Sequence, residues 1–295
     1  MVSKTEGFIE ISTGKIHYLE WGRGDQIHLL HANGFCAGVY APFIKYLSDD
    51  YTIVASDIRG HGDSSPVRQR RIRGWEIFAE DLNEFIRKKM NPPVIGIGHS
   101  LGGVTTLIAA VKYPDLFSKI VLIDPVIFSP KLLILITLAR LSGLAKFFPI
   151  ARAARRRKKN FSSREEVYQR YSSGRGMFKT WPEEFIESYL DCAILIKDKK
   201  TALLKCDPEL EAQIFESVPA SIWRYAGRVK CPVLAIRGEK SDTFRKDAAE
   251  RLYRFVPRYD LITIPDAGHF VPMEKPAEVA KAIKAFLGKN DTSKL

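Results

Sequence analysis

The pentapeptide Gly98-His99-Ser100-Leu101-Gly102 constrains the fold of this chain more than any other segment. An apolar, strand-like run at residues 94–97 precedes it, and residues 104–111 follow with a helical pattern. A G-x-S-x-G motif between a strand and a helix is typical of a sharp turn that exposes its serine above a sheet. This context predicts Ser100 as a nucleophile. It also predicts the backbone amide of Leu101, at the helix N-terminus, as a donor to an oxyanion.

A serine hydroxyl needs a general base before it becomes a useful nucleophile. Among six histidines, His269 is the best candidate because it follows the β-branched run 261–264. That position predicts a loop at the C-terminal end of a late strand, where ligands bind in open α/β sheets. The interpretation of His269 as a packed loop residue is the simpler alternative. The chain order Ser, Asp, His favours catalysis.

The base in turn needs a carboxylate that orients it. Asp242 follows the strand-like run 233–237 and is the acid that we expect in this role. Glu239 lies in the same loop, three residues nearer the strand, and is an alternative. Asp124 ends another strand-like run, 119–123, and is a second alternative.

Strand-like and helix-like runs alternate along most of the chain, which predicts an α/β fold. Two runs near the N-terminus alternate apolar and polar residues, as an antiparallel edge pair would. Later runs are more continuously apolar and suit parallel strands that are covered on both faces. A helix is expected over residues 75–89, where apolar side chains recur at helical spacing. The strand-like runs are 8–11, 16–20, 26–30, 52–55, 94–97, 120–123, 233–236 and 261–264.

These motifs together resemble the α/β-hydrolase superfamily, and in particular its small serine esterase and lipase-like members with a helical cap. The resemblance implies a mostly parallel sheet flanked by helices, formed by residues 1–125 and 227–295. It also implies an inserted α-helical cap at residues 126–226, where no clear strand is visible. In the family, a His-Gly loop after an early strand supplies a second oxyanion amide.

The matching loop here is His31-Ala32-Asn33-Gly34-Phe35, which departs from the usual pattern because two residues separate His31 from Gly34. Aligning the glycine makes Phe35 the expected second donor, with Asn33 as a contributor. His31, Asn33, His99 and Trp223 are expected to line the site. The segment 57–64 resembles a part of the family that is mostly architectural, so His61 is interpreted as structural.

Basic residues are concentrated in one region of a chain whose net charge is +12. Residues 125–164 contain ten Lys and Arg and no acid. This segment includes an apolar run, 132–136, which precedes most of the basic residues and is far too short to span a bilayer. Apolar residues beside a basic cluster suit contact with anionic lipid, whereas a solvated helix face balanced by acids is the alternative. The cluster is Arg152, Arg155, Arg156, Arg157, Lys158 and Lys159.

Other kinds of chemistry have little support in the sequence. The four cysteines are scattered without a C-x-x-C pair, which argues against zinc and gives no disulfide framework. No dinucleotide or phosphate-binding motif is visible, so neither a metal nor an organic cofactor is expected. No nucleic-acid recognition module is evident. The polar N-terminus predicts a cytoplasmic protein, with peripheral membrane contact through the basic cluster.

The sequence therefore predicts a cofactor-independent hydrolase of carboxylic esters that acts through an acyl-serine on Ser100. Lipid-like esters such as a monoacylglycerol or a lysophospholipid are candidate substrates. A C–C bond hydrolase with the same three residues is one alternative. A degenerate hydrolase that serves as a binding protein is another.

Overall fold

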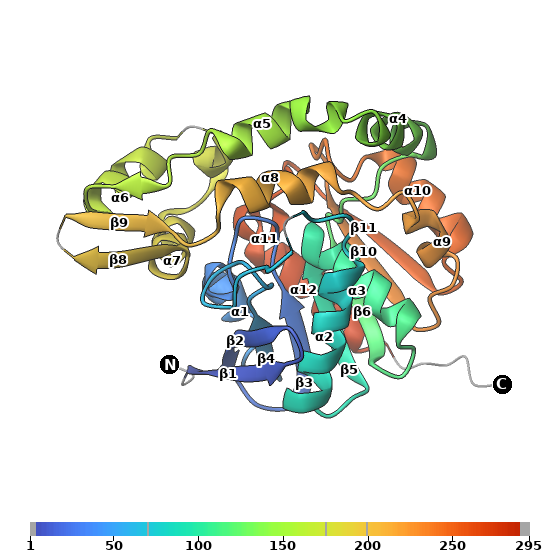
Figure 1. Cartoon of the computed structure of the whole chain (residues 1–295). Helices are drawn as coiled ribbons and strands as arrows, with labels where there is room; N and C mark the ends of the chain where they lie inside the picture. The colour runs from blue at the N-terminus through green and yellow to red at the C-terminus, as the bar shows by residue number, and fades with distance from the viewer. Residues whose placement is uncertain (1–3, 70, 175, 199, 290–295) are drawn as a thin grey trace.

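A computed structural model describes residues 4–69, 71–174, 176–198 and 200–289, and its centre is an eight-stranded sheet (Figure 1). Two N-terminal strands pair antiparallel at one edge, and β2 continues antiparallel onto β4. All remaining pairs are parallel. The strands, in spatial order, are β1 (Thr5–Ile11), β2 (Gly14–Trp21), β4 (Tyr51–Ser56), β3 (Asp25–Leu30), β5 (Val94–His99), β6 (Phe117–Ile123), β10 (Val233–Gly238) and β11 (Tyr259–Ile264).

Helices cover both faces of this sheet, which explains the continuously apolar strands. Alternate side chains of β6 enter two different clusters: Val121 packs on one face and Leu122 on the other. The first face is covered by α1 (Ala41–Ile44) and α12 (Pro276–Leu287), and the second by α2 (Glu76–Lys89), α3 (Leu101–Lys112) and α10 (Lys246–Phe255). The predicted α/β architecture, with a mostly parallel sheet flanked by helices, is present, and so is each expected strand.

Residues 126–226 lie outside the large sheet and run over the C-terminal ends of its parallel strands (Figure 1). The helices of this stretch are α4 (Pro130–Leu141), η2 (Leu144–Phe147), α5 (Pro149–Arg155), α6 (Arg164–Ser172), η3 (Gly176–Thr180), α7 (Glu183–Ala193), α8 (Pro208–Glu216) and α9 (Ile222–Ala226).

This stretch is mostly helical, as expected, but the expectation that it contains no strand is wrong. Three short strands form an antiparallel sheet in the order β7 (Asn160–Phe161), β9 (Thr201–Leu204) and β8 (Ile194–Asp198). They escape sequence detection because their outward positions are charged or exposed, and because β7 has only two residues. The last helix of this stretch, α9, buries Ile222 and Ala226 in the same hydrophobic cluster as α3. The chain therefore packs on the core before residue 227, where the core was expected to resume.

A disulfide joins Cys36 to Cys192 and so connects the core to the cap. Cys36 directly precedes η1 (Ala37–Tyr40), and Cys192 lies near the end of α7, which packs against η1. The two residues are 156 positions apart in the sequence, and only the fold brings their Cα atoms to 6.3 Å. The expectation that the cysteines form no framework is therefore wrong for this pair. Because stable disulfides are typical of oxidising compartments, the bond also argues against the expected reducing setting.

Candidate active site

Ser100 occupies a strained turn between β5 and α3. Its backbone has φ 55° and ψ −114°, a region that residues other than glycine rarely adopt. The two flanking glycines are required by close backbone approach. A Cβ on Gly98 would lie 2.3 Å from the carbonyl oxygen of Gly102, and one on Gly102 would lie 2.2 Å from that of Leu30. The turn thus presents the serine hydroxyl beyond the end of the strand.

His269 lies beside this serine, on the loop after β11. Its Nε2 is 3.0 Å from Oγ of Ser100, and its Nδ1 is 2.8 Å from Oδ1 of Asp124. Because an ionised carboxylate only accepts hydrogen bonds, Nδ1 carries the proton and Nε2 is left as an acceptor. The imidazole therefore has the tautomer that can take a proton from Ser100.

Asp124, rather than Asp242, is the carboxylate that holds His269. It is fully buried at the end of β6, and it also accepts hydrogen bonds from the Gly238 amide (2.9 Å) and the Ser241 hydroxyl (2.6 Å). Asp242 is exposed, and its carboxylate accepts only a 3.3 Å hydrogen bond from Thr243 within the described residues. The expectation for Asp242 is therefore wrong. The loop after β10 contributes donors to the acid and does not contribute the acid itself.

Glu239, the other alternative, helps to shape the loop that carries His269. Its carboxylate accepts a hydrogen bond from the amide of Asp266 at 3.1 Å. Glu274 does the same for the amide of Gly268 at 2.6 Å. These two acids bracket His269 along the chain and hold its backbone in place from outside the line of reacting groups.

The loop after β3 lies against the serine turn, but its donors differ from those expected. The Phe35 N–H donates to the carbonyl of Ala32 at 3.2 Å, so it is already used inside a turn, and the expectation for Phe35 is wrong. Asn33 lines the same cavity as Ser100. Its side chain is fixed at both ends, since Nδ2 donates to the carbonyl of Glu211 and Oδ1 accepts from His61. The first residue of α3 is Leu101, as expected.

A buried chain of hydrogen bonds joins this loop to the His269 loop, and sequence reasoning missed its central residue. Nε2 of His99 is 3.0 Å from the carbonyl of His269, so it must donate there. Nδ1 of His99 then accepts from the Tyr40 hydroxyl at 2.7 Å, and the Tyr40 oxygen accepts from the Ala32 amide at 3.0 Å. Burial, followed by the nearby His269, lowers the pKa of His99, so this ring stays neutral and does not compete for the serine proton. No local sequence signal marks Tyr40.

Two further histidines support loops, as expected for His61. His31 donates from Nδ1 to the carbonyl of Ala32 and accepts the Ile58 amide at Nε2. Burial lowers the pKa of His61 to about 3 and also lowers that of His31. Both rings are therefore neutral connectors behind the cavity wall.

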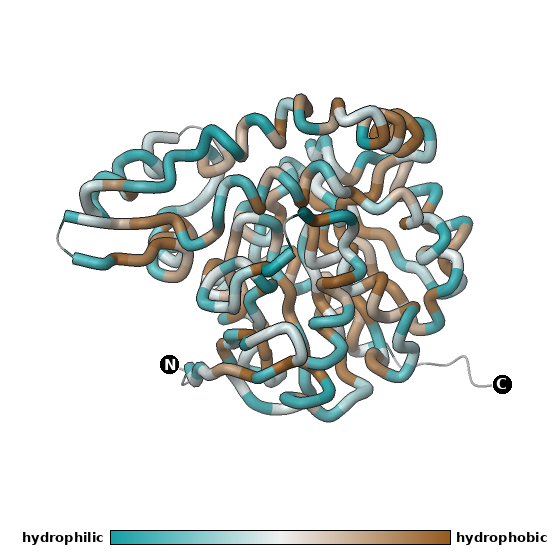
Figure 2. The backbone as a smooth tube through the Cα atoms, viewed as in Figure 1, coloured by the Kyte–Doolittle hydropathy of each residue, from teal (hydrophilic) through white to brown (hydrophobic). Residues whose placement is uncertain are grey.

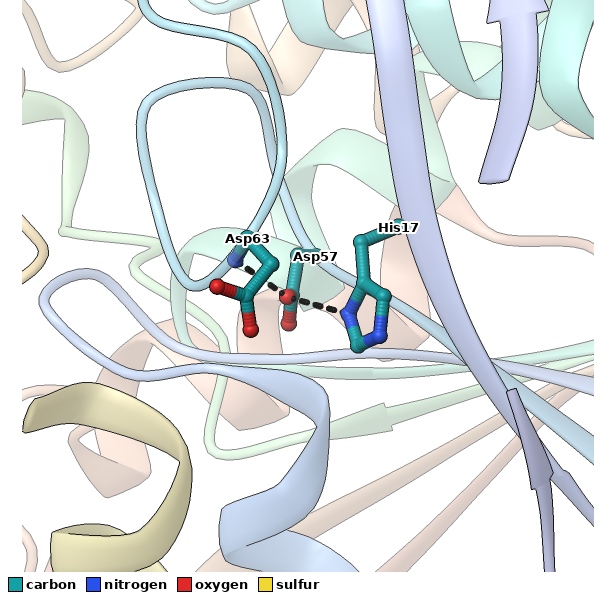
Figure 3. Close-up of side chains that lie close together, drawn as sticks. All are labelled: His17, Asp57 and Asp63. Atoms are coloured by element: carbon teal, nitrogen blue, oxygen red, sulfur yellow. Dashed lines mark hydrogen bonds and ion pairs between the residues drawn. The ribbon is translucent and has the colours of Figure 1, made fainter. Parts of the chain in front are cut away.

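Asp57 joins three segments in the same region (Figure 3). Its carboxylate accepts from Nδ1 of His17 (2.8 Å) and from the amides of Ala37 (2.7 Å) and Asp63 (3.0 Å). Burial alone would raise the pKa of Asp57, but the His17 hydrogen bond and the other polar neighbours lower it overall. Asp63 itself is exposed and pairs with Lys205 of the cap. These contacts give the three side chains of Figure 3 a role in loop positioning.

A cavity of about 1260 Å³ opens beside Ser100 and His269, between the core and the cap. Its lining is mostly apolar and includes Val126, Phe128, Leu132, Ile136, Phe148, Ile150, Phe178 and Phe215. Asn33 is part of this wall, whereas His31, His99 and Trp223 are not. Trp223 donates its indole N–H to the carbonyl of Phe128 and packs against Phe255, so its expected place in the site is wrong.

One charged pair reaches this wall, and the sequence did not single it out. Nη1 of Arg157 is 2.6 Å from Oε2 of Glu211, and Nη2 is 2.5 Å from the Tyr189 hydroxyl. The pair is nearly buried, with side-chain exposures of 15% and 8%. Burial raises the pKa of Glu211 even beside the guanidinium. The pair lies directly over Gly34, where an added Cβ would come within 3.1 Å of Arg157.

Comparisons with known proteins agree with this architecture. A family model for the alpha/beta hydrolase fold matches residues 27–276. The chain is 27% identical to a 2-(acetamidomethylene)succinate hydrolase of Mesorhizobium japonicum over 95% of this chain and 94% of that protein. It is also 27% identical to a Haemophilus influenzae protein provisionally named as an esterase/lipase, over 90% and 82% of the two chains. A crystal structure of an E-2-(acetamidomethylene)succinate hydrolase superposes with a TM-score of 0.79 at 24% identity, covering 97% of this chain and all of that one.

The family match covers most of the chain, and the sheet, the serine turn and the histidine loop have the arrangement that the motifs predicted. The chain belongs to the α/β-hydrolase fold family.

Proposed function

We propose that this protein is a serine hydrolase that cleaves carboxylic esters through an acyl-enzyme on Ser100. The observation that carries the proposal is the line of hydrogen bonds from Ser100 through His269 to Asp124, at the wall of an apolar cavity. A nucleophile, a base and a buried carboxylate in this order are the parts that acyl transfer needs.

In the proposed reaction, Oγ of Ser100 attacks the ester carbonyl while its proton moves to Nε2 of His269. The carboxylate of Asp124 stabilises the resulting imidazolium through Nδ1. The amide of Leu101 and, in place of Phe35, the amide of Asn33 donate to the oxyanion. Support for Asn33 comes from its place in the cavity wall and from its doubly anchored side chain. His269 then protonates the leaving alcohol and activates water for deacylation.

The cavity wall favours esters with a long apolar acyl group. The volume of about 1260 Å³ exceeds the roughly 300–1,000 Å³ typical of small-molecule sites. Aliphatic and aromatic side chains of α4, α5 and α8 contribute to its surface. A monoacylglycerol or lysophospholipid would bury its acyl chain there and leave its polar end near the opening.

A second candidate is a hydrolase of small carboxylated substrates, whose scissile bond is an amide or C–C bond. The Mesorhizobium relative is named for a substituted succinate, which is a dicarboxylate. In this chain, Arg157 and Arg170 both border the cavity, and Arg157 lies close to Gly34. Glu211 already neutralises Arg157, which leaves the exposed Arg170 as the cation at the cavity that a carboxylate would use.

A substrate panel separates these candidates. Nitrophenyl esters from acetate to palmitate, a monoacylglycerol, a lysophospholipid, a hemisuccinate ester and a vinylogous diketone would be compared by kcat/KM. We expect the preference to rise with acyl length. A preference for the hemisuccinate or the diketone would replace the proposal by the second candidate. A fluorophosphonate probe with mass spectrometry should label Ser100, and failure to label any serine would favour a binding protein.

A further inference from the structure

The outer surface of the cap carries large apolar side chains that no described element covers. Seven of them, all on consecutive elements α4, η2 and α5, are more than half exposed: Ile134 (61%), Leu135 (63%), Leu138 (58%), Leu141 (76%), Leu144 (55%), Phe147 (56%) and Ile150 (54%). We call these seven residues the outer apolar face. Figure 2 shows α4 as a strongly hydrophobic helix at the outer edge of the molecule. Exposed apolar patches of this kind mark interaction surfaces.

Cations surround the outer apolar face, and they coincide only in part with the cluster that the sequence suggested. Arg155 pairs with Glu209 and Glu216, and Arg157 pairs with Glu211. Lys158 and Lys159 pair with Glu166 and Asp207. Four of the six residues of the predicted cluster therefore have acidic partners, which come from α6, from α8 and from Asp207 at the N-cap of α8.

A second set of cations, which shares Arg152 and Arg156 with that cluster, has no acidic partner within ion-pair distance among the described residues. It consists of Lys131, Arg140, Lys146, Arg152 and Arg156, which we call the rim cations. No Asp or Glu occurs between residues 125 and 164, so nothing in this segment offsets them. The long stems of Lys and Arg allow the charge to stay in a polar layer while apolar neighbours go deeper.

The outer apolar face is continuous with the wall of the cavity. On α4, Leu132 and Ile136 line the cavity, whereas Ile134, Leu135 and Leu138 point outward. Ile150 belongs to both surfaces. The helix is therefore apolar on two sides, with one side toward the substrate space and the other toward the surroundings. Within the described residues, no helix is both long enough and apolar enough to cross a bilayer.

We infer that the outer apolar face docks onto an anionic membrane surface, with α4 and α5 lying in the interface and the rim cations at the headgroups. A short helix with apolar residues beside basic ones suits such a position. Charge complementarity selects this occupant over a second copy of the chain. A two-fold contact through this face would bring ten rim cations together without a single acid from the segment. Docking would place the cavity beside amphiphilic molecules in the lipid layer.

Vesicle flotation of the full chain tests this inference independently of the proposed chemistry, because it uses Ser100→Ala to prevent lipid turnover. We expect flotation with phosphatidylcholine vesicles that contain 30% phosphatidylglycerol, at least tenfold weaker flotation with phosphatidylcholine alone, and a loss as salt increases. Failure to float with the anionic vesicles at low salt would overturn the inference. Absence of ester hydrolysis in the wild type would leave the flotation result unaffected.

Matched variants locate the surface. Leu138→Asp/Leu141→Asp should reduce anionic flotation at least tenfold, whereas Tyr253→Asp on α10, where the side chain is 69% exposed, should not. Arg152→Gln/Arg156→Gln should reduce it at least fivefold. The charge-matched control Arg23→Gln/Lys230→Gln changes exposed residues just before β3 and β10, at the N-terminal ends of these strands and away from the cap. Equal losses in test and control variants would overturn the inference.

Light scattering and thermal melts complete the test. The wild type should be monomeric at micromolar concentration, and the surface variants should melt like the wild type because the changed side chains are largely exposed. A dimer that Leu138→Asp/Leu141→Asp dissociates, together with absent flotation, would assign the face to a second copy instead. If the Asp variant unfolds, the Arg152→Gln/Arg156→Gln variant decides the question alone.

Discussion

The two sides of the active site are held in place by different parts of the molecule. Ser100 and Asp124 are anchored by the sheet, since the Ser100 amide donates to the carbonyl of Ile123 and the Asp124 amide donates to that of Ile236. These are contacts between neighbouring strand ends, only a residue or two from the reacting groups. The positions of Ser100 and Asp124 are therefore fixed mainly by the sheet.

The loop 32–36 on the other side is anchored largely by the cap. The carbonyl of Glu211 holds the Asn33 side chain, and Arg157 and Glu211 press on Gly34. The ring of Phe35 packs against Trp181 and Tyr189, and Cys36 is bonded to Cys192. Changes in the cap should therefore alter the oxyanion side and the stability of the fold, whereas changes at the strand ends should abolish chemistry in a protein that still folds.

The largest effect is expected at the nucleophile. Ser100→Ala should lower kcat on a nitrophenyl ester by about a factor of 10⁶, because no other group supplies the attacking oxygen. The fold should be unchanged, since the strained turn is defined by the glycines on either side. Steady-state kinetics and a thermal melt check both halves of this prediction. A residual rate within a hundredfold of the wild type would move the nucleophile elsewhere.

The second-largest effect on kcat is expected at the carboxylate that orients His269. Asp124→Asn should lower kcat by about 10⁴, since an amide at this position favours the wrong tautomer of His269. The control Asp242→Asn changes an exposed side chain and should stay within about twofold of the wild type. Comparable losses in the two variants would contradict the separation between the sheet-held acid and the surface acid.

On the cap side, we expect a stability effect. Glu211→Gln should lower the free energy of unfolding by roughly 3–5 kcal/mol because it leaves the nearly buried Arg157 without its counter-charge. Glu209→Gln, on the same helix, removes an exposed partner of Arg155 and should cost less than about 1 kcal/mol. Urea denaturation compares the two. Equal costs would mean that the buried pair does not anchor the loop.

The disulfide is expected to have a somewhat smaller effect. Cys192→Ala should lower the free energy of unfolding by about 2–4 kcal/mol, since it frees a long loop in the unfolded chain. Dithiothreitol should destabilise the wild type to the same extent and leave the variant unchanged. The control Cys231→Ala removes a free, partly buried thiol. Identical unfolding curves for reduced and oxidised wild type would show that the core and cap do not depend on this bond.

The smallest effect is expected for the pH dependence of stability, through the buried side chain of His28. Burial lowers the pKa of His28 from 6.5 to about 3, so the unfolded chain takes up a proton in that range and the folded chain does not. The stability contribution of His28 is complete above pH 6.5 and falls as the pH drops toward 3. The loss of unfolding free energy between pH 7 and pH 5 should be about 2 kcal/mol smaller in His28→Asn. The same pH dependence in both proteins would contradict the neutral buried ring.

Local patterns in the sequence were enough for the fold and for two of the three residues in the hydrogen-bonded line at the cavity, Ser100 and His269. The serine turn could be recognised because its G-x-S-x-G pattern lies directly between a strand-like run and a helical pattern, and because Gly98 must leave room for the backbone of Gly102 only four residues later. The strands were recognisable because burial on both faces requires continuous apolar runs. His269 follows the last of these runs, and this position predicted that it lies on a loop at the C-terminal end of a strand. These features depend mainly on residues that are close together in the sequence, so they can be recognised without the tertiary structure.

The choice between residues in equivalent places needed the tertiary structure. Asp124 and Asp242 both follow strands, and β6 and β10 are neighbours in the sheet, so only the path of each loop decides which carboxylate meets His269. Likewise, the basic run gave no hint that Arg155 and Arg157 pair with acids 54 residues later, or that Cys36 meets Cys192. Charge, burial and pairing depend on distances in space, and the folding of the cap onto the core sets these distances between segments that are remote in sequence.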